Sequence, residues 1–355
     1  MATREEVLEA LRSVMDPELG RDIVSLGMVE AWDIDPAGRV RVTVQLTTPA
    51  CPLKNLIQKN VEAAIRTLPG VTAVEVTLGA RVKAREKEKG ERLPTVKNVI
   101  AVGSGKGGVG KSTVAVNLAL ALSEAGASVG LLDADLYGPS VPILLGIQDT
   151  RASTVTIDGR EYLAPQEVAG LRVFSMGLLL DPDQAVIWRG PLLHKALTQF
   201  LEDVWWGDLD YLVLDLPPGT GDVQISLANL VPISSAVLVT TPQDVAFADV
   251  RRALRMFETT KVPVLGVVEN MATFTCSTCG TVHHPFGEGR VRRAVEEMGL
   301  AWLGDLPLDA HISPQADQGV PFLLGEPEGL PAAAIRRIAS AVAARQSVLN
   351  FQGNR

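Results

Sequence analysis

The chain has 355 residues, of which 46% are hydrophobic and 21% charged, a length and balance typical of a soluble globular protein with two or three domains. The net charge of −8 argues against broad nucleic-acid binding, and no run approaches the roughly 18 unbroken apolar residues of a membrane span. The N-terminus does not resemble a signal peptide, and three cysteines, an odd number, do not suggest a secreted disulfide framework. We therefore expect a cytoplasmic protein without a membrane or nucleic-acid partner.

Residues 1–80 are predicted to form a small α/β domain. Thr3-x-x-Glu6 is a capping-box pattern ahead of a helical face of apolar residues, which predicts a first helix. Strands are expected at 28–34, 40–46 and 71–78, and the second shows a clean apolar–polar alternation. Pro52 is expected to open a second helix.

Cys51 directly precedes this proline and is the N-cap if Pro52 is the first helical residue. The positive end of the helix would then lower the pKa of the thiol and favour the thiolate. The alternative is a small buried side chain, because free cysteine is among the most buried residue types. The local sequence leaves both interpretations open.

Residues 81–97 hold seven basic and three acidic residues and almost no apolar ones. Such a segment cannot bury a core, so we expect a charged linker. A run of this kind is more often a solvated tether than a binding patch.

Residues 98–355 are predicted to form an α/β domain with a mostly parallel sheet covered by helices on both faces, because short apolar strands alternate with helical patterns. The expected strands are 98–102, 128–133, 171–176, 211–215, 236–240, 264–270 and 301–306. The expected helices lie near 112–125, 191–204, 222–230, 244–258, 288–298 and 331–346. Several strands end in polar residues, at the carboxyl edge where open parallel sheets bind ligands.

A phosphate-binding loop follows the first of these strands. Its residues are Gly103, Ser104, Gly105, Lys106, Gly107, Gly108, Val109, Gly110, Lys111, Ser112 and Thr113, and Gly105 to Ser112 fits G-x-x-x-x-G-K-[ST]. In such loops backbone N–H groups converge on phosphate oxygens, the lysine reaches the β- and γ-phosphates and the serine can ligate Mg²⁺. A dinucleotide fingerprint, Gly103-x-Gly105-x-x-Gly108, also fits, but it does not call for the Lys-Ser pair.

Acidic residues end two of the expected strands. A Mg²⁺–nucleotide site needs a carboxylate opposite the phosphates, and Asp215 is the candidate. Asp135 is placed to polarise the attacking water, and Asp133 to hold a Mg²⁺-bound water or to orient the loop. For each, the alternative is a carboxylate that caps the next turn.

Cys276 and Cys279 form a C-x-x-C motif just after the strand 264–270. With His283 and His284 close behind, one alternative is a Cys₂His₂ zinc site within the chain, and another is a redox pair. A [4Fe–4S] cluster requires four thiolates, so two chains would have to share it.

The loop from Lys106 to Thr113 resembles the deviant Walker A motif of the MinD/ParA/nitrogenase-iron-protein class of P-loop ATPases. The segments Asp133–Ser140 and Asp215–Asp222 are similar to those of the Mrp/ApbC branch, whose members carry iron–sulfur clusters. This resemblance implies that Lys106 reaches the nucleotide of a second subunit, with Asp135 in switch I and Asp215 in switch II. It also implies that Asn270 contacts adenine, while the absence of an Asn-Lys-x-Asp motif favours ATP over GTP.

The same resemblance implies a [4Fe–4S] cluster bridged between the C-x-x-C motifs of a homodimer. Residues 1–80 resemble the PaaD/SufT-type domain of iron–sulfur assembly, through Asp16-Pro17-Glu18 and the segment around Cys51. That likeness gives Cys51 a possible accessory role in cluster handling or partner contact. The sequence departs from the family's pattern where His283-His284 is followed directly by Pro285-Phe286-Gly287, and this departure leaves open whether His283 or His284 joins the metal site.

Together these features predict a homodimeric, Mg²⁺-dependent ATPase that receives a cluster from an assembly scaffold and transfers it to apo iron–sulfur proteins. Lys106, Lys111 and Asp135 are the expected catalytic residues. Two alternatives stand beside it: a MinD-like positioning ATPase that binds a membrane or partner surface, and a zinc-stabilised P-loop ATPase. The last helical pattern lacks the bulky apolar and basic faces of a membrane anchor.

Overall fold

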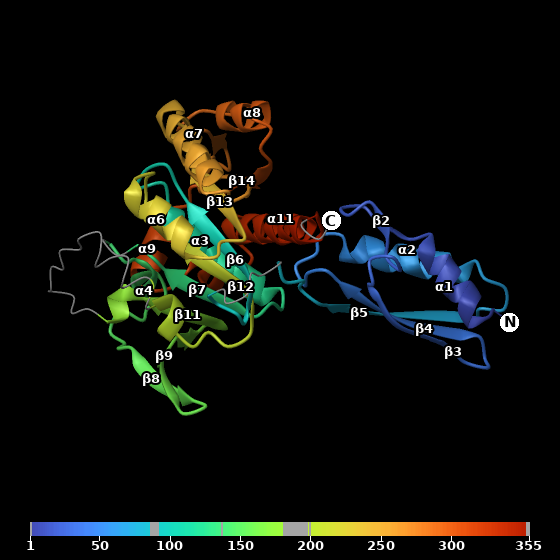
Figure 1. Ribbon diagram of the computed structural model, residues 1–355. Coiled ribbons are helices and arrows are strands. Elements are labelled where there is room, and N and C mark those ends of the chain that lie inside the picture. The colour runs from blue at the N-terminus through green and yellow to red at the C-terminus, as the bar shows by residue number, and fades with distance from the viewer. Residues whose placement is uncertain (1, 86–91, 136–137, 180–197, 199, 353–355) are drawn as a thin grey trace. The chain divides into compact units, whose positions relative to one another are not determined.

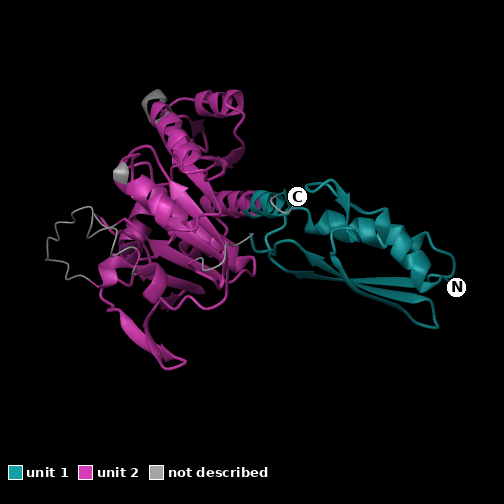
Figure 2. Ribbon diagram, in the orientation of Figure 1, with its two compact units in different colours: residues 1–86, 343–355 teal, residues 87–342 magenta. Residues whose placement is uncertain are grey.

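The computed structural model describes residues 2–85, 92–135, 138–179, 198 and 200–352 (Figure 1). The chain forms two compact units, residues 1–86 with 343–355 and residues 87–342 (Figure 2). Each unit has its own sheet and its own buried core.

The smaller unit packs two helices on one face of a three-stranded sheet of order β3-β4-β5. Strands β3 and β4 are antiparallel, whereas β4 and β5 are parallel. The alternation predicted for 40–46 is confirmed, since Val40, Val42, Val44 and Leu46 are buried. The elements are α1 (Arg4–Arg12), β1 (Met15–Asp16), β2 (Arg21–Asp22), β3 (Val29–Ile34), β4 (Arg39–Leu46), α2 (Lys54–Arg66) and β5 (Ala73–Ala80).

Both helices of this unit present an apolar stripe to the sheet. The Thr3 side chain caps α1 together with Glu6, as the capping-box pattern predicts. In α2 the residues Ile57, Val61 and Ile65 are buried at the four-residue spacing of one helix face.

The larger unit is built on an eight-stranded sheet of order β10-β11-β7-β12-β6-β13-β14-β17. All pairs are parallel except β10 with β11. Its strands are β6 (Val96–Gly103), β7 (Val129–Asp133), β10 (Gln166–Val168), β11 (Leu171–Ser175), β12 (Leu209–Asp215), β13 (Ser235–Thr240), β14 (Val264–Glu269) and β17 (Trp302–Asp305). The mostly parallel α/β sheet predicted from the sequence is confirmed, with each of its seven expected strands present.

Helices lie on both faces of this sheet (Figure 1). They are α3 (Lys111–Glu124), α4 (Val141–Leu144), α6 (Asp222–Leu230), α7 (Asp244–Thr259), α8 (Arg290–Glu297), α9 (Ile312–Asp317), α10 (Phe322–Gly325) and α11 (Leu330–Gln352), with a 3₁₀ turn η1 at Met176–Leu178. Helix α3 is central, because all residues from Val114 to Leu122 are buried. Burial on every side is typical of a helix enclosed by the rest of the fold, in contrast to a surface helix with one apolar face.

Several elements were not predicted. They are a hairpin of β8 (Ser153–Ile157) and β9 (Arg160–Ala164), a second hairpin of β15 (Phe274–Thr275) and β16 (Val282–His283), strand β10 and the short helices α4, α9 and α10. The helix expected over 191–204 lies largely outside the described residues. Two-residue strands and four-residue helices carry too little periodicity to be read from a sequence.

The charged segment 81–97 is partly structured. Val82 and Leu93 are buried, and β6 begins at Val96, within the expected linker. In the smaller unit Asn350 donates a hydrogen bond of 2.8 Å to the carbonyl of Lys83, and the Lys83 ammonium lies 4.2 Å from the ring centre of Phe351. Residues 86–91, the middle of the expected linker, lie outside the described residues.

Across the described part of the chain, no helix combines the length and apolar character needed to cross a membrane.

Candidate nucleotide and cluster site

The phosphate loop joins β6 to α3 at the carboxyl edge of the large sheet. Gly108 and Gly110 have φ angles of +77° and +79°, a region that L side chains rarely adopt. A Cβ atom on Gly105 would lie 2.3 Å from the backbone carbon of Asp249 in α7. Backbone conformation and close packing therefore account for glycine at these positions, and they leave the loop free to cradle a phosphate.

Lys111 opens α3 and points to the end of β12. Its Nζ atom lies 2.5 Å from Oδ1 of Asp215 and 3.2 Å from Oγ of Ser112, and both partners of the ion pair are buried. Burial raises the pKa of Asp215, while the Lys111 ammonium acts in the opposite direction. The ion pair thus joins the two residues predicted to handle phosphate and Mg²⁺.

The second carboxylate oxygen of Asp215, Oδ2, is buried, and none of the described residues hydrogen bonds to it. A buried carboxylate oxygen without a partner is costly unless an ion or water satisfies it. Oxygen ligands and water are what Mg²⁺ prefers, so Asp215 and the Ser112 hydroxyl fit a magnesium site.

Asp133 is buried beside Asp215, its in-register neighbour on β7. Its Oδ1 accepts the N–H of Asp135 at 3.1 Å, and its Oδ2 accepts the N–H of Val141 at 3.2 Å and the hydroxyl of Ser175 at 3.0 Å. Burial and the nearby charge of Asp215 raise the pKa of Asp133 to about 7. These contacts favour the loop-orienting role of Asp133, and its contact to a Mg²⁺-bound water stays a prediction.

Asp135 is half-buried and lines a cavity of about 410 Å³ together with Pro217, Pro218, Gly221 and Gln224. The structure thus brings the loop after β7 and the loop after β12 to one cavity beside Asp215. Such a position is open to water, which the predicted role of Asp135 requires.

Asn270 follows β14 and contacts the phosphate loop, since its Nδ2 donates to the carbonyl of Val109 at 2.9 Å. Asn270, Gly110 and Thr113 all line a cavity of about 310 Å³. The segment Leu306–Asp309 and Phe322 also line it. A mainly apolar cavity with a few polar groups beside the phosphate loop suits a nucleotide base.

Lys106 is half-buried, and its carbonyl accepts the Ser104 hydroxyl at 2.9 Å. Within the described ranges, no ion pair involves its ammonium group. Lys106 and Lys111 therefore differ within one loop, because Lys111 pairs with Asp215 whereas Lys106 has no ion-pair partner among the described residues.

The C-x-x-C motif forms the tip of the β15–β16 hairpin. The Cys276 N–H donates to the carbonyl of Thr281 at 2.9 Å, and the Gly280 N–H donates to the carbonyl of Cys276 at 2.9 Å. Cys276 is half-buried and Cys279 is exposed. Hydrogen bonding with Thr281, followed by hydrogen bonding with Cys276, lowers the pKa of the Cys279 thiol.

Neither histidine joins these thiols. Among the described residues, one group of three or more His, Cys, Asp or Glu side chains is close enough to hold an ion, and it consists of Asp309, His311 and Glu326. His284 lies 3.7 Å from Glu288 instead. The Cys₂His₂ zinc alternative therefore lacks the convergent ligands that it requires.

The N-cap prediction for Cys51 is wrong. Helix α2 begins at Lys54 with Leu53 as its N-cap, so Pro52 is not the first helical residue. Cys51 is buried in the core of the smaller unit. Burial, with a smaller effect of Glu18 and Asp16, raises the pKa of this thiol to about 11. An accessory role for Cys51 stays a prediction.

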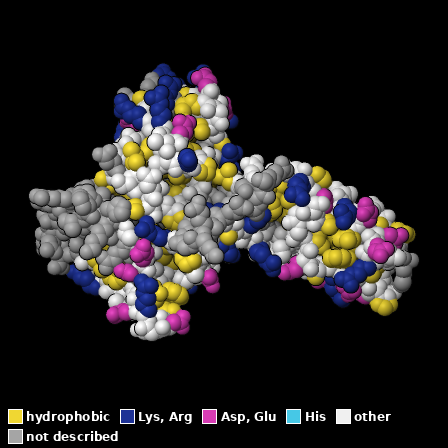
Figure 3. Space-filling model, viewed as in Figure 1, with side chains coloured by type: hydrophobic (Ala, Val, Ile, Leu, Met, Phe, Trp, Pro, Cys, Tyr) yellow, Lys and Arg dark blue, Asp and Glu magenta, His cyan; other side chains and the backbone are white. Residues whose placement is uncertain are grey.

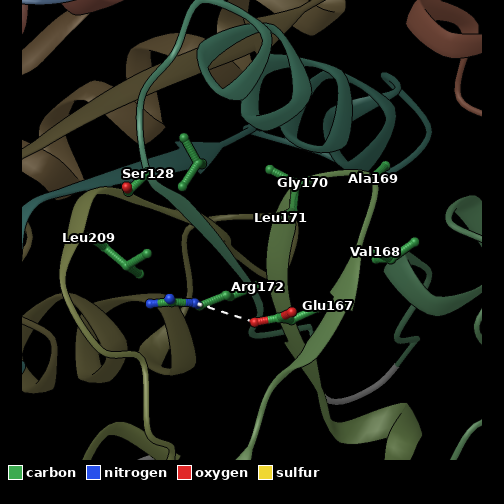
Figure 4. Close-up of a pocket in the computed structure, with 9 residues that line it drawn as sticks. Ser128, Glu167, Val168, Ala169, Gly170, Leu171, Arg172 and Leu209 are labelled. Carbon is green, nitrogen blue, oxygen red and sulfur yellow. Dashed lines mark ion pairs between the residues drawn. The ribbon is translucent and has the colours of Figure 1, made fainter.

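A further cavity, of about 320 Å³, lies where β7, β11 and β12 begin (Figure 4). Arg172 and Glu167 form an ion pair of 3.9 Å at its edge, and Ser128 and Leu209 also line it. None of the predicted site residues lines this cavity. The phosphate loop, Asp133 and Asp215 lie at the opposite, carboxyl ends of the strands. On the face shown in Figure 3, basic and acidic side chains are interspersed.

Comparison with known proteins agrees with this geometry. The family model described as NUBPL iron-transfer P-loop NTPase matches residues 95–343. The chain belongs to this family. A second model, described as iron-sulfur cluster assembly protein, matches residues 4–77.

Relatives of known name share most of the chain. An iron-sulfur cluster carrier protein of Deinococcus radiodurans is 50% identical over 345 residues, which are 97% of this chain and 96% of the relative. One of Synechocystis is 46% identical over 351 residues, covering 98% and 99%. A nucleotide-binding protein from Archaeoglobus fulgidus, solved in complex with ADP, has a TM-score of 0.59 at 38% identity and covers 67% of this chain and 92% of its own.

Two contacts of this candidate site were not predicted from the sequence. Thr281 lies 3.2 Å from the Cys279 sulfur through its hydroxyl. The segment Leu306–Asp309 lines the cavity beside Asn270. No charge or motif spacing in the sequence indicates the contact of Thr281. For the other segment there was a signal, because Pro307 directly follows the expected strand 301–306 and favours a turn at the sheet edge.

Proposed function

We propose that this protein is a Mg²⁺-dependent ATPase that holds a [4Fe–4S] cluster between two copies of the chain and transfers it to apo-proteins. The observation that carries the proposal is the pair of free thiols, exposed Cys279 and half-buried Cys276, at the tip of a hairpin in the unit that holds the P-loop. Family membership supports a nucleotide-binding iron-transfer protein in general. The hydrolysis, the shared cluster and the transfer are the proposed parts.

Lys111 is proposed to exchange partners when ATP binds. Its ammonium pairs with Asp215 within the fold. The β- and γ-phosphates of ATP carry more negative charge than this single carboxylate and would bind the ammonium more strongly. Asp215 and Ser112 would then hold Mg²⁺, which neutralises phosphate charge when bound. Asp135, in the cavity beside them, would orient the attacking water.

Lys106 is proposed to act in the second subunit. Its ammonium makes no ion pair with a described residue of its own chain, so it is available to a nucleotide across a dimer interface. A positive charge added at the γ-phosphate stabilises the transition state. ATP hydrolysis would therefore require the dimer.

The cluster is proposed to sit between two hairpins because of ligand number. A [4Fe–4S] cluster takes four thiolates, and the hairpin of one chain supplies Cys276 and Cys279. The odd third thiol, Cys51, is buried with a raised pKa and is poorly suited to bind iron. Two copies of the hairpin complete the set of four thiolates.

With an odd number of cysteines and none in a disulfide, we place this activity in the cytoplasm.

The segment Leu306–Asp309 offers a route of coupling between nucleotide and cluster. Its residues line the cavity proposed for the base. The same segment is hydrogen bonded to the stem of the cysteine hairpin, from Ala272 N to Leu306 O at 3.0 Å and from Leu308 N to Thr273 O at 2.7 Å. A bridge between Phe274 and Leu308 adds to this ladder. A base in the cavity would thus contact a segment that is hydrogen bonded to the stem of the cysteine hairpin.

The test is transfer of the cargo. The protein is loaded anaerobically with iron and sulfide and mixed with the apo form of an enzyme that needs a [4Fe–4S] cluster, with and without ATP and Mg²⁺. Recovery of acceptor activity, with loss of absorbance from the donor, is the expected result. A loaded protein that never activates the acceptor would contradict the proposal.

A further inference from the structure

Thr281 forms a hydrogen-bonded unit with Cys279 at the hairpin tip. The Cys279 thiol donates a hydrogen bond to the Thr281 hydroxyl, with 3.2 Å between the sulfur and the oxygen. The Thr281 carbonyl accepts the Cys276 N–H at 2.9 Å, which fixes the threonine backbone in the turn. The hydroxyl is therefore held next to one of the two thiols.

This contact changes direction when the sulfur binds iron. A free thiol can donate to the hydroxyl, but an iron-bound thiolate has no proton, so the hydroxyl becomes the donor. A hydrogen bond to a ligand sulfur withdraws electron density from the metal–sulfur bond and raises the reduction potential of the cluster. It also stabilises the thiolate that is left when that bond breaks.

The two cysteines are consequently unequal. Cys279 is exposed and carries the bond from Thr281, whereas Cys276 is half-buried and its backbone is tied into the hairpin. An acceptor cysteine can approach the iron bound to Cys279 more readily than the iron bound to Cys276.

We infer that Thr281 is a positioning residue that makes Cys279 the ligand from which the cluster departs first. This rests on the proposed cluster at the C-x-x-C motif. The step is a ligand substitution: the iron–sulfur bond to Cys279 breaks and a bond to the acceptor cysteine forms. No electron is exchanged, and the proton lost by the acceptor thiol passes to the Cys279 thiolate.

The test compares Thr281→Val, which removes the hydroxyl at nearly constant volume, with Thr281→Ser, which keeps it. Thr278→Val is the matched control, because Thr278 lies exposed between the two cysteines. Each anaerobically loaded protein is mixed with excess apo-acceptor, and the rate of cluster transfer is measured. Because a hydrogen bond to a charged group is lost, transfer from Thr281→Val should be roughly threefold to tenfold slower, with Thr281→Ser and the control near the unmodified rate.

A second measurement is the reduction potential of the bound cluster, followed by its electron paramagnetic resonance signal. It should shift to more negative values in Thr281→Val and not in Thr281→Ser. Equal transfer rates and equal potentials in all variants would overturn the inference. Failure of Thr281→Val to take up the cluster would also overturn it, because the Thr281 hydroxyl would then be needed to hold the cluster and not to release it. If the unmodified protein takes up no cluster, the proposed function fails first, so the two failures are distinguishable.

Discussion

Lys106 and Lys111 belong to one loop, but their ammonium groups have different environments. Lys111 is buried in an ion pair with Asp215, whereas Lys106 makes no ion pair with a described residue of its chain. The loop motif alone predicts the role of Lys111. The role of Lys106 came from family resemblance, and the structure adds only its availability.

Lys106→Ala should lower ATP hydrolysis at least about 100-fold while ATP affinity stays within a few-fold, because a charge at the γ-phosphate acts mainly in the transition state. Steady-state phosphate release and equilibrium binding of ATP are the two measurements. Lys59→Ala, at an exposed position of α2, is the control. Undiminished turnover in Lys106→Ala would rule out a lysine acting across the dimer.

Two glycines of the phosphate loop should respond differently to one added methyl group. A Cβ on Gly105 meets the Asp249 backbone at 2.3 Å, whereas one on Gly107 meets no atom within 4 Å. Gly105→Ala should therefore lower the unfolding free energy by about 1–3 kcal/mol through overpacking, and Gly107→Ala should leave it nearly unchanged. Thermal unfolding without nucleotide measures both, and equal melting temperatures would refute the packing argument.

Glu269 predicts a pH dependence of stability. It is buried beside Asp305 with Oε1 free of hydrogen bonds from the described residues, and burial, followed by the charge of Asp305, raises its pKa from 4.5 to about 7. Between these values the folded chain keeps a proton that the unfolded chain releases. The unfolding free energy therefore falls as pH rises from 4.5 to 7, by up to about 3 kcal/mol.

Glu269→Gln should remove this loss. Urea unfolding of Glu269→Gln and of the unmodified protein at pH 5, 6, 7 and 8 should show a stability difference that grows in favour of the variant as pH rises. Glu258→Gln, at an exposed position of α7, serves as the control. A difference that stays constant with pH would show that Glu269 is ionised across this range.

At the scale of elements, the segment Leu306–Asp309 lines the proposed base cavity and is hydrogen bonded to the stem of the cysteine hairpin. Binding of a non-hydrolysable ATP analogue should slow amide hydrogen exchange at 306–308 and at the hairpin stem, residues 272–275. The β8–β9 hairpin, which lines no part of that cavity, should exchange at an unchanged rate. Protection confined to the phosphate loop would contradict coupling through this segment.

The main sheet could be predicted from the sequence because buried parallel strands appear there as continuous apolar runs of sufficient length. The phosphate loop was equally accessible, since its chemistry demands a particular residue spacing. Of the two interpretations of Cys51, the buried one is confirmed. The N-cap one is wrong because Pro52 fits the first turn of a helix, yet the chain turns once more and α2 starts at Lys54. The contacts of Thr281 and of Leu306–Asp309 were not predicted, because they depend on the tertiary fold and leave no local pattern in the sequence.

At the scale of the whole molecule, the proposed function requires two copies of the chain. In it Lys106 acts at the nucleotide site of the second copy, and each copy supplies two of the four thiolates of the cluster. Dimer formation should therefore follow cluster loading and ATP binding. Light scattering of the Cys276→Ala/Cys279→Ala variant with iron and sulfide should show no cluster-dependent gain in mass, whereas the unmodified protein should double its mass.

The stoichiometry and location of the cluster test this account most directly. Anaerobic reconstitution, followed by iron and sulfide analysis and visible absorption, should give about four iron and four sulfide ions for two chains. Cys51→Ala should load in the same way, and Cys276→Ala/Cys279→Ala should not load at all. Uptake of the same cluster by the double variant, or a full cluster on a single chain of the unmodified protein, would contradict the central claim.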